Sequence, residues 1–203
     1  MLEAAKHDFR TTELDLELLS TPFRVQTNWH VITGASCSGK TTLINQLADQ
    51  GFQTSPESAR QYFESELSKG RTMDEIRENR AALTRQILGM MVKVESGLEA
   101  AEVTFLDRAL PDGLAYFRFA GMDPNELLPD CFQHRYVSVF MLDRFPYQRD
   151  GVRSADDETA AYFEAWMYRD YIALGYSVIR VPVLPLEERL GFVFERLSED
   201  KLL

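Results

Sequence analysis

The sequence predicts an α/β fold, a three-layer sandwich in which helices cover both faces of a mostly parallel, five-stranded sheet. From Trp29 onward, short runs rich in β-branched and aromatic residues alternate with longer stretches of helical apolar spacing, the order that a parallel sheet requires. A glycine-rich loop separates the first such run from the first helical stretch. The 203 residues, 45% hydrophobic and 27% charged, suffice for one domain with a full core.

We predict each strand from a compact apolar run that ends at glycine, proline or a charged residue. The five predicted strands cover residues 29–33, 52–55, 103–106, 136–142 and 176–181.

The helices are predicted from apolar spacing and from their end signals. Gly51 is a suitable C-terminal cap, and Thr72 with Glu75 forms the pattern of a capping box. The capping box is expected to open one long helix that continues to about residue 99. The predicted helices cover residues 41–50, 57–68, 72–99, 156–174 and 185–197.

The first 28 residues differ from the rest of the chain. Polar and apolar side chains alternate over residues 12–18, which suits a half-exposed edge strand or a loose arm. We therefore predict an N-terminal arm or edge strand over residues 1–28 and a single α/β domain over residues 29–203.

Composition excludes several classes of function. The chain has 22 Lys and Arg against 32 Asp and Glu, a net charge of −10, so we expect no binding to nucleic acid. The apolar run at 137–142 is too short to cross a bilayer, so no membrane insertion is expected. Two cysteines without a paired spacing and an N-terminus without a secretory pattern favour a cytoplasmic protein.

The strongest signal is the run GASCSGKT, which fits the phosphate-binding (P-loop, or Walker A) pattern GxxxxGK[ST] without a mismatch. In such loops the backbone N–H groups surround phosphate oxygens, the lysine reaches the outer phosphates, and the threonine hydroxyl binds Mg²⁺. The residues predicted to bind ATP are Gly34, Ala35, Ser36, Cys37, Ser38, Gly39, Lys40, Thr41 and Thr42.

Two carboxylates follow predicted strands, where ligands bind in parallel sheets. Glu57 would face the acceptor side of the γ-phosphate and orient or deprotonate an acceptor hydroxyl, or it is an ordinary acid in the first turn of a helix. Asp107 would approach Mg²⁺ together with Thr41, while Asp112 beyond it either binds substrate or lies in a plain turn.

Arg149 and Arg153 flank Gly151 in the segment before the helix predicted at 156–174. They are candidates for a lid that closes over the transferring phosphoryl group and neutralises its charge. The alternative is a solvated loop whose charges pair with nearby acids.

Aromatic and sulfur-containing side chains elsewhere are expected mainly in the core. Tyr116, Phe117 and Phe119 are candidates for an acceptor pocket but fit buried core positions as well. Met91 in the predicted long helix is assigned to the core. No role in metal binding or catalysis is assigned to any of the three histidines.

These motifs, in their order and spacing, resemble a known family. The segments are ITGASCSGKTTLINQLADQGF, SPESAR, FLDRALPDGLAY, RDGVRSADDE and LGYSVIRVPVLPLEER. Together they are similar to the small kinase-like P-loop ATPases known as AAA family ATPases or AAA domain proteins, which include relatives of ribosylnicotinamide kinases. The resemblance covers about residues 29–198. It implies a nucleoside- or nucleotide-kinase-like sheet, with Lys40, Glu57, Asp107, Arg149 and Arg153 at the active site. Because the sequence shows no second-region-of-homology arginine and no sensor motif, we expect no hexameric motor.

We therefore expect an ATP- and Mg²⁺-dependent enzyme that transfers the γ-phosphate to the hydroxyl of an unidentified small molecule. The alternative is a nucleotide-dependent switch that reports bound ATP or GTP to a protein partner. The absence of an NKxD run favours ATP over GTP.

Overall fold

The computed structural model describes residues 12–145 and 157–199. Its main sheet has five parallel strands in the order β3-β4-β2-β6-β7, so the strand that leads into the phosphate loop lies at the centre. The strands are β2 Trp29–Thr33, β3 Gln53–Ser55, β4 Thr104–Asp107, β6 Ser138–Leu142 and β7 Val178–Val181. All five predicted strands are confirmed, with small shifts at their ends.

Helices cover both faces of this sheet. Along β2 the side chains alternate, so that Val31 packs on the face covered by α4, α5 and α7, and Ile32 packs on the face covered by α1 and α8. These helices are α1 Lys40–Asp49, α4 Arg80–Ser96, α5 Asp112–Phe119, α7 Asp157–Ala173 and α8 Leu186–Glu199. The three-layer α/β sandwich is the predicted fold.

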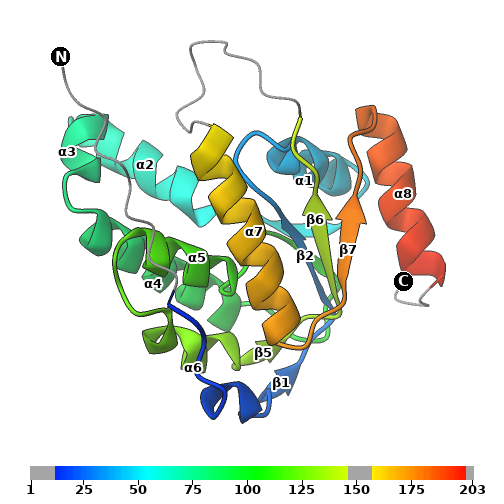
Figure 1. Cartoon of the computed structure of the whole chain (residues 1–203). Helices are drawn as coiled ribbons and strands as arrows, with labels where there is room; N and C mark the ends of the chain where they lie inside the picture. The colour runs from blue at the N-terminus through cyan, green and yellow to red at the C-terminus, as the bar shows by residue number, and fades with distance from the viewer. Residues whose placement is uncertain (1–11, 146–156, 200–203) are drawn as a thin grey trace.

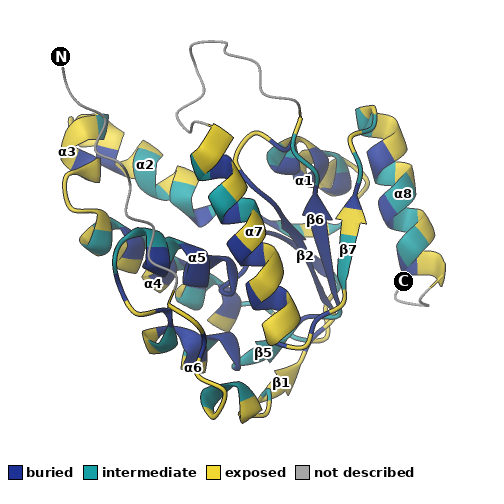
Figure 2. Ribbon diagram, in the orientation of Figure 1, coloured by how far each residue is buried: buried dark blue, intermediate teal, exposed yellow. Residues whose placement is uncertain are grey.

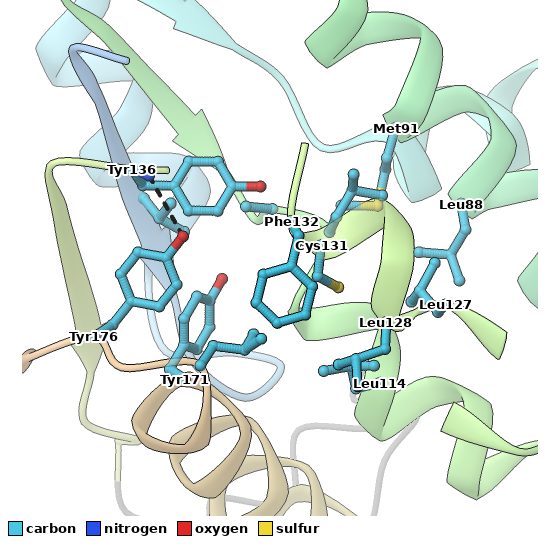
Figure 3. Close-up of a cluster of buried hydrophobic side chains, with 14 of the residues drawn as sticks. Leu88, Met91, Leu114, Leu127, Leu128, Cys131, Phe132, Tyr136, Tyr171 and Tyr176 are labelled. Atoms are coloured by element: carbon cyan, nitrogen blue, oxygen red, sulfur yellow. Dashed lines mark hydrogen bonds between the residues drawn. The ribbon is translucent and has the colours of Figure 1, made fainter. Parts of the chain in front are cut away.

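Burial follows this layering. The central strands β2 and β6 are buried along their whole length, whereas in the edge strand β7 only the last residue, Val181, is buried (Figure 2). Between the sheet and the helices α4, α5 and α7 lies a cluster of buried side chains, mostly leucines and aromatic residues (Figure 3). Within it the Tyr176 hydroxyl accepts a hydrogen bond from the backbone N–H of Tyr136 at 3.4 Å.

The prediction for residues 12–18 is wrong. The segment forms no strand, and a short 3₁₀ helix, Leu18–Ser20, follows it. The Asp15 carboxylate accepts a hydrogen bond from the N–H of Glu17 at 2.7 Å, a turn that competes with extended pairing. The arm is not loose either, because Leu14 is buried and the Thr12 carbonyl accepts from Arg118 Nε at 2.7 Å. A small second sheet pairs β1 Val25–Gln26 with β5 His134–Arg135.

The long helix predicted over 72–99 is two helices. The capping box on Thr72 and Glu75 is present, but it opens the short helix α3, Met73–Arg77. Asn79 then accepts a hydrogen bond from the N–H of Ala82 at 2.9 Å and caps α4 as a second helix. The helix α2, Ser58–Ser68, precedes this pair and matches its prediction.

Further short elements were not predicted from the sequence. Asp112 lies in the first turn of α5 instead of in a plain turn. A 3₁₀ turn at Pro124–Glu126 and the short helix α6, Leu128–Cys131, follow. None of the helices within 12–145 and 157–199 has the length and apolar character needed to cross a bilayer.

Candidate active site

The phosphate loop joins the end of β2 to the start of α1, as the sequence predicts. Gly34 has a φ of 132°, and a Cβ atom there would lie 2.7 Å from the carbonyl oxygen of Leu142 at the end of β6. Gly39 has a φ of 89° and caps α1. Both positions require glycine because a side chain would be strained or would collide with its neighbours. Ser36, Cys37 and Thr42 are exposed, whereas Ser38 is buried.

Lys40 is buried at the first position of α1. Its ammonium donates to the carbonyl oxygen of Ala35 at 2.8 Å and lies 3.5 Å from the Ser38 hydroxyl oxygen. Burial, and next the positive charge of Arg108, lower the pKa of Lys40 to about 8. Lys40 is thus a buried positive charge that forms no close ion pair among the described residues. A bound triphosphate would supply the negative charge that stabilises it.

Thr41 and Asp107 meet across the ends of α1 and β4. The Thr41 hydroxyl donates to Asp107 Oδ2 at 3.1 Å, while Asp107 Oδ1 is buried and has no hydrogen-bond partner among the described residues. Burial, and next the charge of Glu57, raise the pKa of Asp107. An unsatisfied carboxylate oxygen beside a hydroxyl suits a hard cation, so the pair fits Mg²⁺. Within the described residues no cluster of three or more His, Cys, Asp or Glu side chains is placed to hold a metal ion.

Glu57 lies at the N-terminus of α2 and is ion-paired. Its carboxylate accepts from Arg108 Nε at 3.1 Å. Burial alone would raise the pKa of Glu57, but the charges of Arg108 and Lys40 outweigh it and hold the pKa below its usual value. Glu57 is therefore ionised at neutral pH, so its oxygens accept hydrogen bonds.

Arg108 organises this side of the site. It has a φ of 74°, rare for a residue with a side chain, and its Nη1 donates to Asp112 at 3.2 Å. Asp112 is buried, and both of its oxygens accept from the Thr33 hydroxyl, at 2.7 and 2.8 Å. Arg108 thus links Glu57 to Asp112, and the left-handed backbone at Arg108 is an example of strain held in place at a site.

A cavity of about 450 Å³ opens beside these groups. Ser36 of the phosphate loop, Glu57, Asp107 and Arg108 all line it. The apolar part of its lining comes from α2, α4, α5 and α7: Phe63, Leu83, Ile87, Leu88, Met91, Tyr116, Phe119 and Phe163.

The cavity lining includes some of the side chains that were expected in the core. Tyr116 and Phe119 line it, whereas Phe117 packs in the core. Met91, assigned to the core, lines the cavity and belongs to the core cluster as well. The two arginines proposed as a lid, Arg149 and Arg153, lie outside the described residues.

One residue of this region was missed by the sequence analysis. Arg189 in α8 is buried, and its Nη1 donates to the Ser38 carbonyl at 2.6 Å. Its guanidinium carbon lies 4.4 Å from the centre of the Phe145 ring, and Nε and Nη2 have no hydrogen-bond partner in the described part of the chain. The only sequence signal is an arginine in the acidic first turns of a helix, which is a common surface pattern.

Comparisons with known proteins agree with this architecture. A family model for the AAA domain matches residues 29–189, whereas no curated protein matches the sequence. Among solved structures, the NadR protein in complex with NR has a TM-score of 0.63 and 18% identity over 85% of this chain and 51% of that chain. The chain thus spans about half the length of NadR.

Two further structures match over nearly their whole length. Deoxyadenosine kinase from M. mycoides has a TM-score of 0.60 and 14% identity, covering 84% of this chain and 98% of that one. Thymidylate kinase from Candida albicans has a TM-score of 0.51 and 13% identity, covering 87% and 93%. At these identities the likeness concerns the fold, which is that of kinase-like P-loop proteins. With the family model matching most of its length, the chain belongs to the AAA domain family.

Proposed function

We propose that the protein is an ATP- and Mg²⁺-dependent phosphotransferase that moves the γ-phosphate of ATP to a hydroxyl group of a small molecule. The observation that carries this proposal is the cavity, whose lining joins Ser36 of the phosphate loop to Glu57 and Asp107. Its volume of about 450 Å³ is typical of small-molecule sites. A switch that only hydrolyses its nucleotide would need no such space beside the phosphate loop.

Each side chain has a distinct part in the proposed reaction. Lys40 would bind the outer phosphates, and Thr41 and Asp107 would hold Mg²⁺, which neutralises phosphate charge when bound. Glu57 would accept a hydrogen bond from the acceptor hydroxyl and take its proton as the phosphoryl group transfers. Arg108 would keep the Glu57 carboxylate ionised and oriented toward the cavity.

The similarity to NadR in complex with NR and to deoxyadenosine kinase supports a small, hydroxyl-bearing acceptor. The identity of that acceptor is open. A panel of nucleosides and other small alcohols, assayed with ATP and Mg²⁺ for ADP release and for the phosphorylated product, would test the proposal. At least one acceptor should raise ADP release far above its rate in water.

Two substitutions test the roles of the residues. Lys40→Ala should abolish nucleotide binding or turnover. Glu57→Gln should lower kcat by about 100-fold or more, as expected for loss of a general base, and leave ATP binding largely intact. Glu64→Gln, an exposed position on the same helix, is the matched control and should behave as the wild type.

The alternative function predicts a different pattern. A nucleotide-dependent switch would hydrolyse ATP slowly with every compound in the panel and would bind a protein partner only in one nucleotide state. That result, or wild-type turnover in Glu57→Gln, would contradict the phosphotransferase.

A further inference from the structure

Two arginines that line the cavity have no carboxylate partner among the described residues. Arg77 ends α3 and Arg80 begins α4. In the ranges that the structure describes, neither guanidinium takes part in a salt bridge, whereas Arg85 on the next turn pairs with Glu126 at 2.9 Å. The neighbouring acids Asp74 and Glu78 do not belong to the cavity lining.

Aromatic rings hold both arginines at the cavity. The guanidinium of Arg80 lies 4.3 Å from the centre of the Phe119 ring, and its Nη1 donates to the Phe119 carbonyl at 3.4 Å. The guanidinium of Arg77 lies 5.7 Å from the centre of the Phe63 ring. Stacking on a ring leaves the edge of a guanidinium available, and that edge binds carboxylate or phosphate oxygens in pairs.

The other charged side chains of the cavity lining interact with opposite charges. Arg108 is paired with Glu57 and Asp112, and Asp107 accepts from Thr41 and lies in the field of Lys40. Among the described residues of the lining, Arg77 and Arg80 are therefore the cations without a salt-bridge partner. Two such guanidinium groups at one cavity would attract an anion.

The arginines and the phosphate loop lie in different parts of the molecule. Figure 1 shows α3, which carries Arg77, at the left margin of the molecule and well away from α1, which carries Lys40. The apolar side chains of α4, α5 and α7 supply the rest of the lining. Glu57 precedes the first turn of α2, whereas Arg77 lies beside Phe63, six residues further along that helix, which is about 9 Å. A ligand that fills the cavity would therefore contact Glu57 with one group, the apolar lining with its body and the arginines with another group.

We propose that the acceptor is an anionic alcohol: its hydroxyl faces Glu57, its body is apolar or aromatic, and a carboxylate or phosphate at its far end binds Arg77 and Arg80. This inference rests on the proposed phosphotransferase function, because it assigns a substrate class to that site. It excludes neutral nucleosides as preferred acceptors.

The test measures binding separately from transfer. Calorimetry with Mg²⁺ and a non-hydrolysable ATP analogue would compare two matched pairs, nucleoside monophosphates with their parent nucleosides and hydroxymethylbenzoate with hydroxymethylbenzamide. We expect the anionic member of at least one pair to bind about tenfold tighter or better, as charge-assisted hydrogen bonds would give. The pair that shows the preference identifies the anion as phosphate or carboxylate.

Variants test whether Arg77 and Arg80 are the cause of the tighter binding of the anionic compound. The double variant Arg77→Gln/Arg80→Gln should abolish it, while leaving the affinity for the ATP analogue and for the neutral compounds unchanged. Arg85→Gln, which removes one positive charge from α4 outside the cavity lining, should retain the preference. Equal binding of the members in both pairs, or a preference that persists in the double variant, would overturn the inference.

ADP release with the same compounds tests the underlying function. Anion binding that depends on both arginines, without any phosphorylated product, would uphold the anion site and contradict the phosphotransferase. Phosphorylation of the neutral members alone would uphold the phosphotransferase and overturn the anionic acceptor.

Discussion

At the scale of single residues, the charged side chains of the site are held in position by contacts within the protein itself. Lys40 rests on the Ala35 carbonyl, Arg108 separates two carboxylates, and Asp107 keeps one oxygen without a partner. Buried polar groups of this kind reduce stability unless something binds them. Their concentration beside one loop is the pattern expected of a functional site.

The lowered pKa of Lys40 predicts that ATP binding depends on pH. Phosphates bind the protonated lysine, so binding should raise its pKa from about 8, and the protein should take up protons when it binds ATP above pH 8. The affinity is then full below this pH and falls by up to about tenfold per pH unit above it. Calorimetry in buffers of different protonation enthalpy measures the uptake.

Lys40→Arg is the control for this effect, because a guanidinium stays charged throughout the range. Whatever its affinity for ATP, this variant should show no lysine-linked uptake. Equal proton uptake at pH 7 and pH 9 in the wild type would show that Lys40 is already fully protonated without nucleotide.

At the scale of secondary-structure elements, one buried ion pair joins α5 to α7. Arg118 donates to both oxygens of Asp170, at 2.7 and 2.9 Å, and its Nε binds the carbonyl of Thr12 in the N-terminal arm. The Arg118 guanidinium also lies 4.1 Å from the centre of the Trp166 ring. Both helices also carry side chains of the cavity lining, so this pair fixes part of the cavity.

Removing one partner of this ion pair should lower the free energy of unfolding more than replacing both partners by apolar residues. Arg118→Met leaves the Asp170 carboxylate buried and uncompensated, which is expected to lower the free energy of unfolding by about 3–5 kcal/mol. Arg118→Met combined with Asp170→Leu should recover a large part of that loss. Urea denaturation of the wild type, both single variants and the double variant gives the coupling energy. Simple additivity of the two single effects would contradict the account.

At the scale of the whole molecule, the central strand contains a buried histidine. His30 lies on β2, with its Nδ1 at 2.8 Å from the Ser138 hydroxyl and its ring 4.9 Å from the centre of the Phe105 ring. Burial lowers the pKa of His30 to about 4. The folded protein therefore holds this histidine neutral between pH 4 and its usual pKa of 6.5.

This histidine predicts loss of stability in mild acid. The unfolded chain takes up the proton first, so the contribution of His30 is complete above about pH 6.5 and is lost as the pH falls toward 4. Between pH 7 and pH 5 the free energy of unfolding should fall by about 2 kcal/mol on this account alone. Urea titrations at several pH values measure the change, and His30→Asn, which cannot titrate, should have a flatter profile. An equal slope in both proteins would assign the effect to other groups.

Features of the fold that are set by residues close together in the sequence were predicted correctly. The five strands follow from short apolar runs, and the phosphate loop follows from fixed spacing between a strand and a helix. The break at Asn79 and the helix that begins at Asp112 were missed, although an Asn cap and a proline before the first turn are helix-start signals. The apolar spacing continues through Asn79, and α5 is only eight residues long, too short for a clear helical period.

The cavity and its partners could not be predicted in the same way. Glu57 and Arg108 lie 51 positions apart, and Arg189 reaches Ser38 over 151 positions. Contacts between residues so far apart in the sequence depend on how the helices pack over the sheet. The spacing of apolar residues predicts single helices and strands but not this packing. The positive φ of Arg108 likewise has no sequence signal, since the residue is neither glycine nor asparagine.

The helices that wall the cavity lie in segments of the chain that contribute no strand to the main sheet. Most of the apolar lining comes from α2, α4 and α5, whereas the triphosphate would be held by a loop anchored on the central strand. In the proposed phosphotransferase, these helices would determine which alcohol is accepted, and the phosphate loop would bind ATP. Exchanging these helices between related chains should change the preferred acceptor and leave ATP binding by the phosphate loop unchanged.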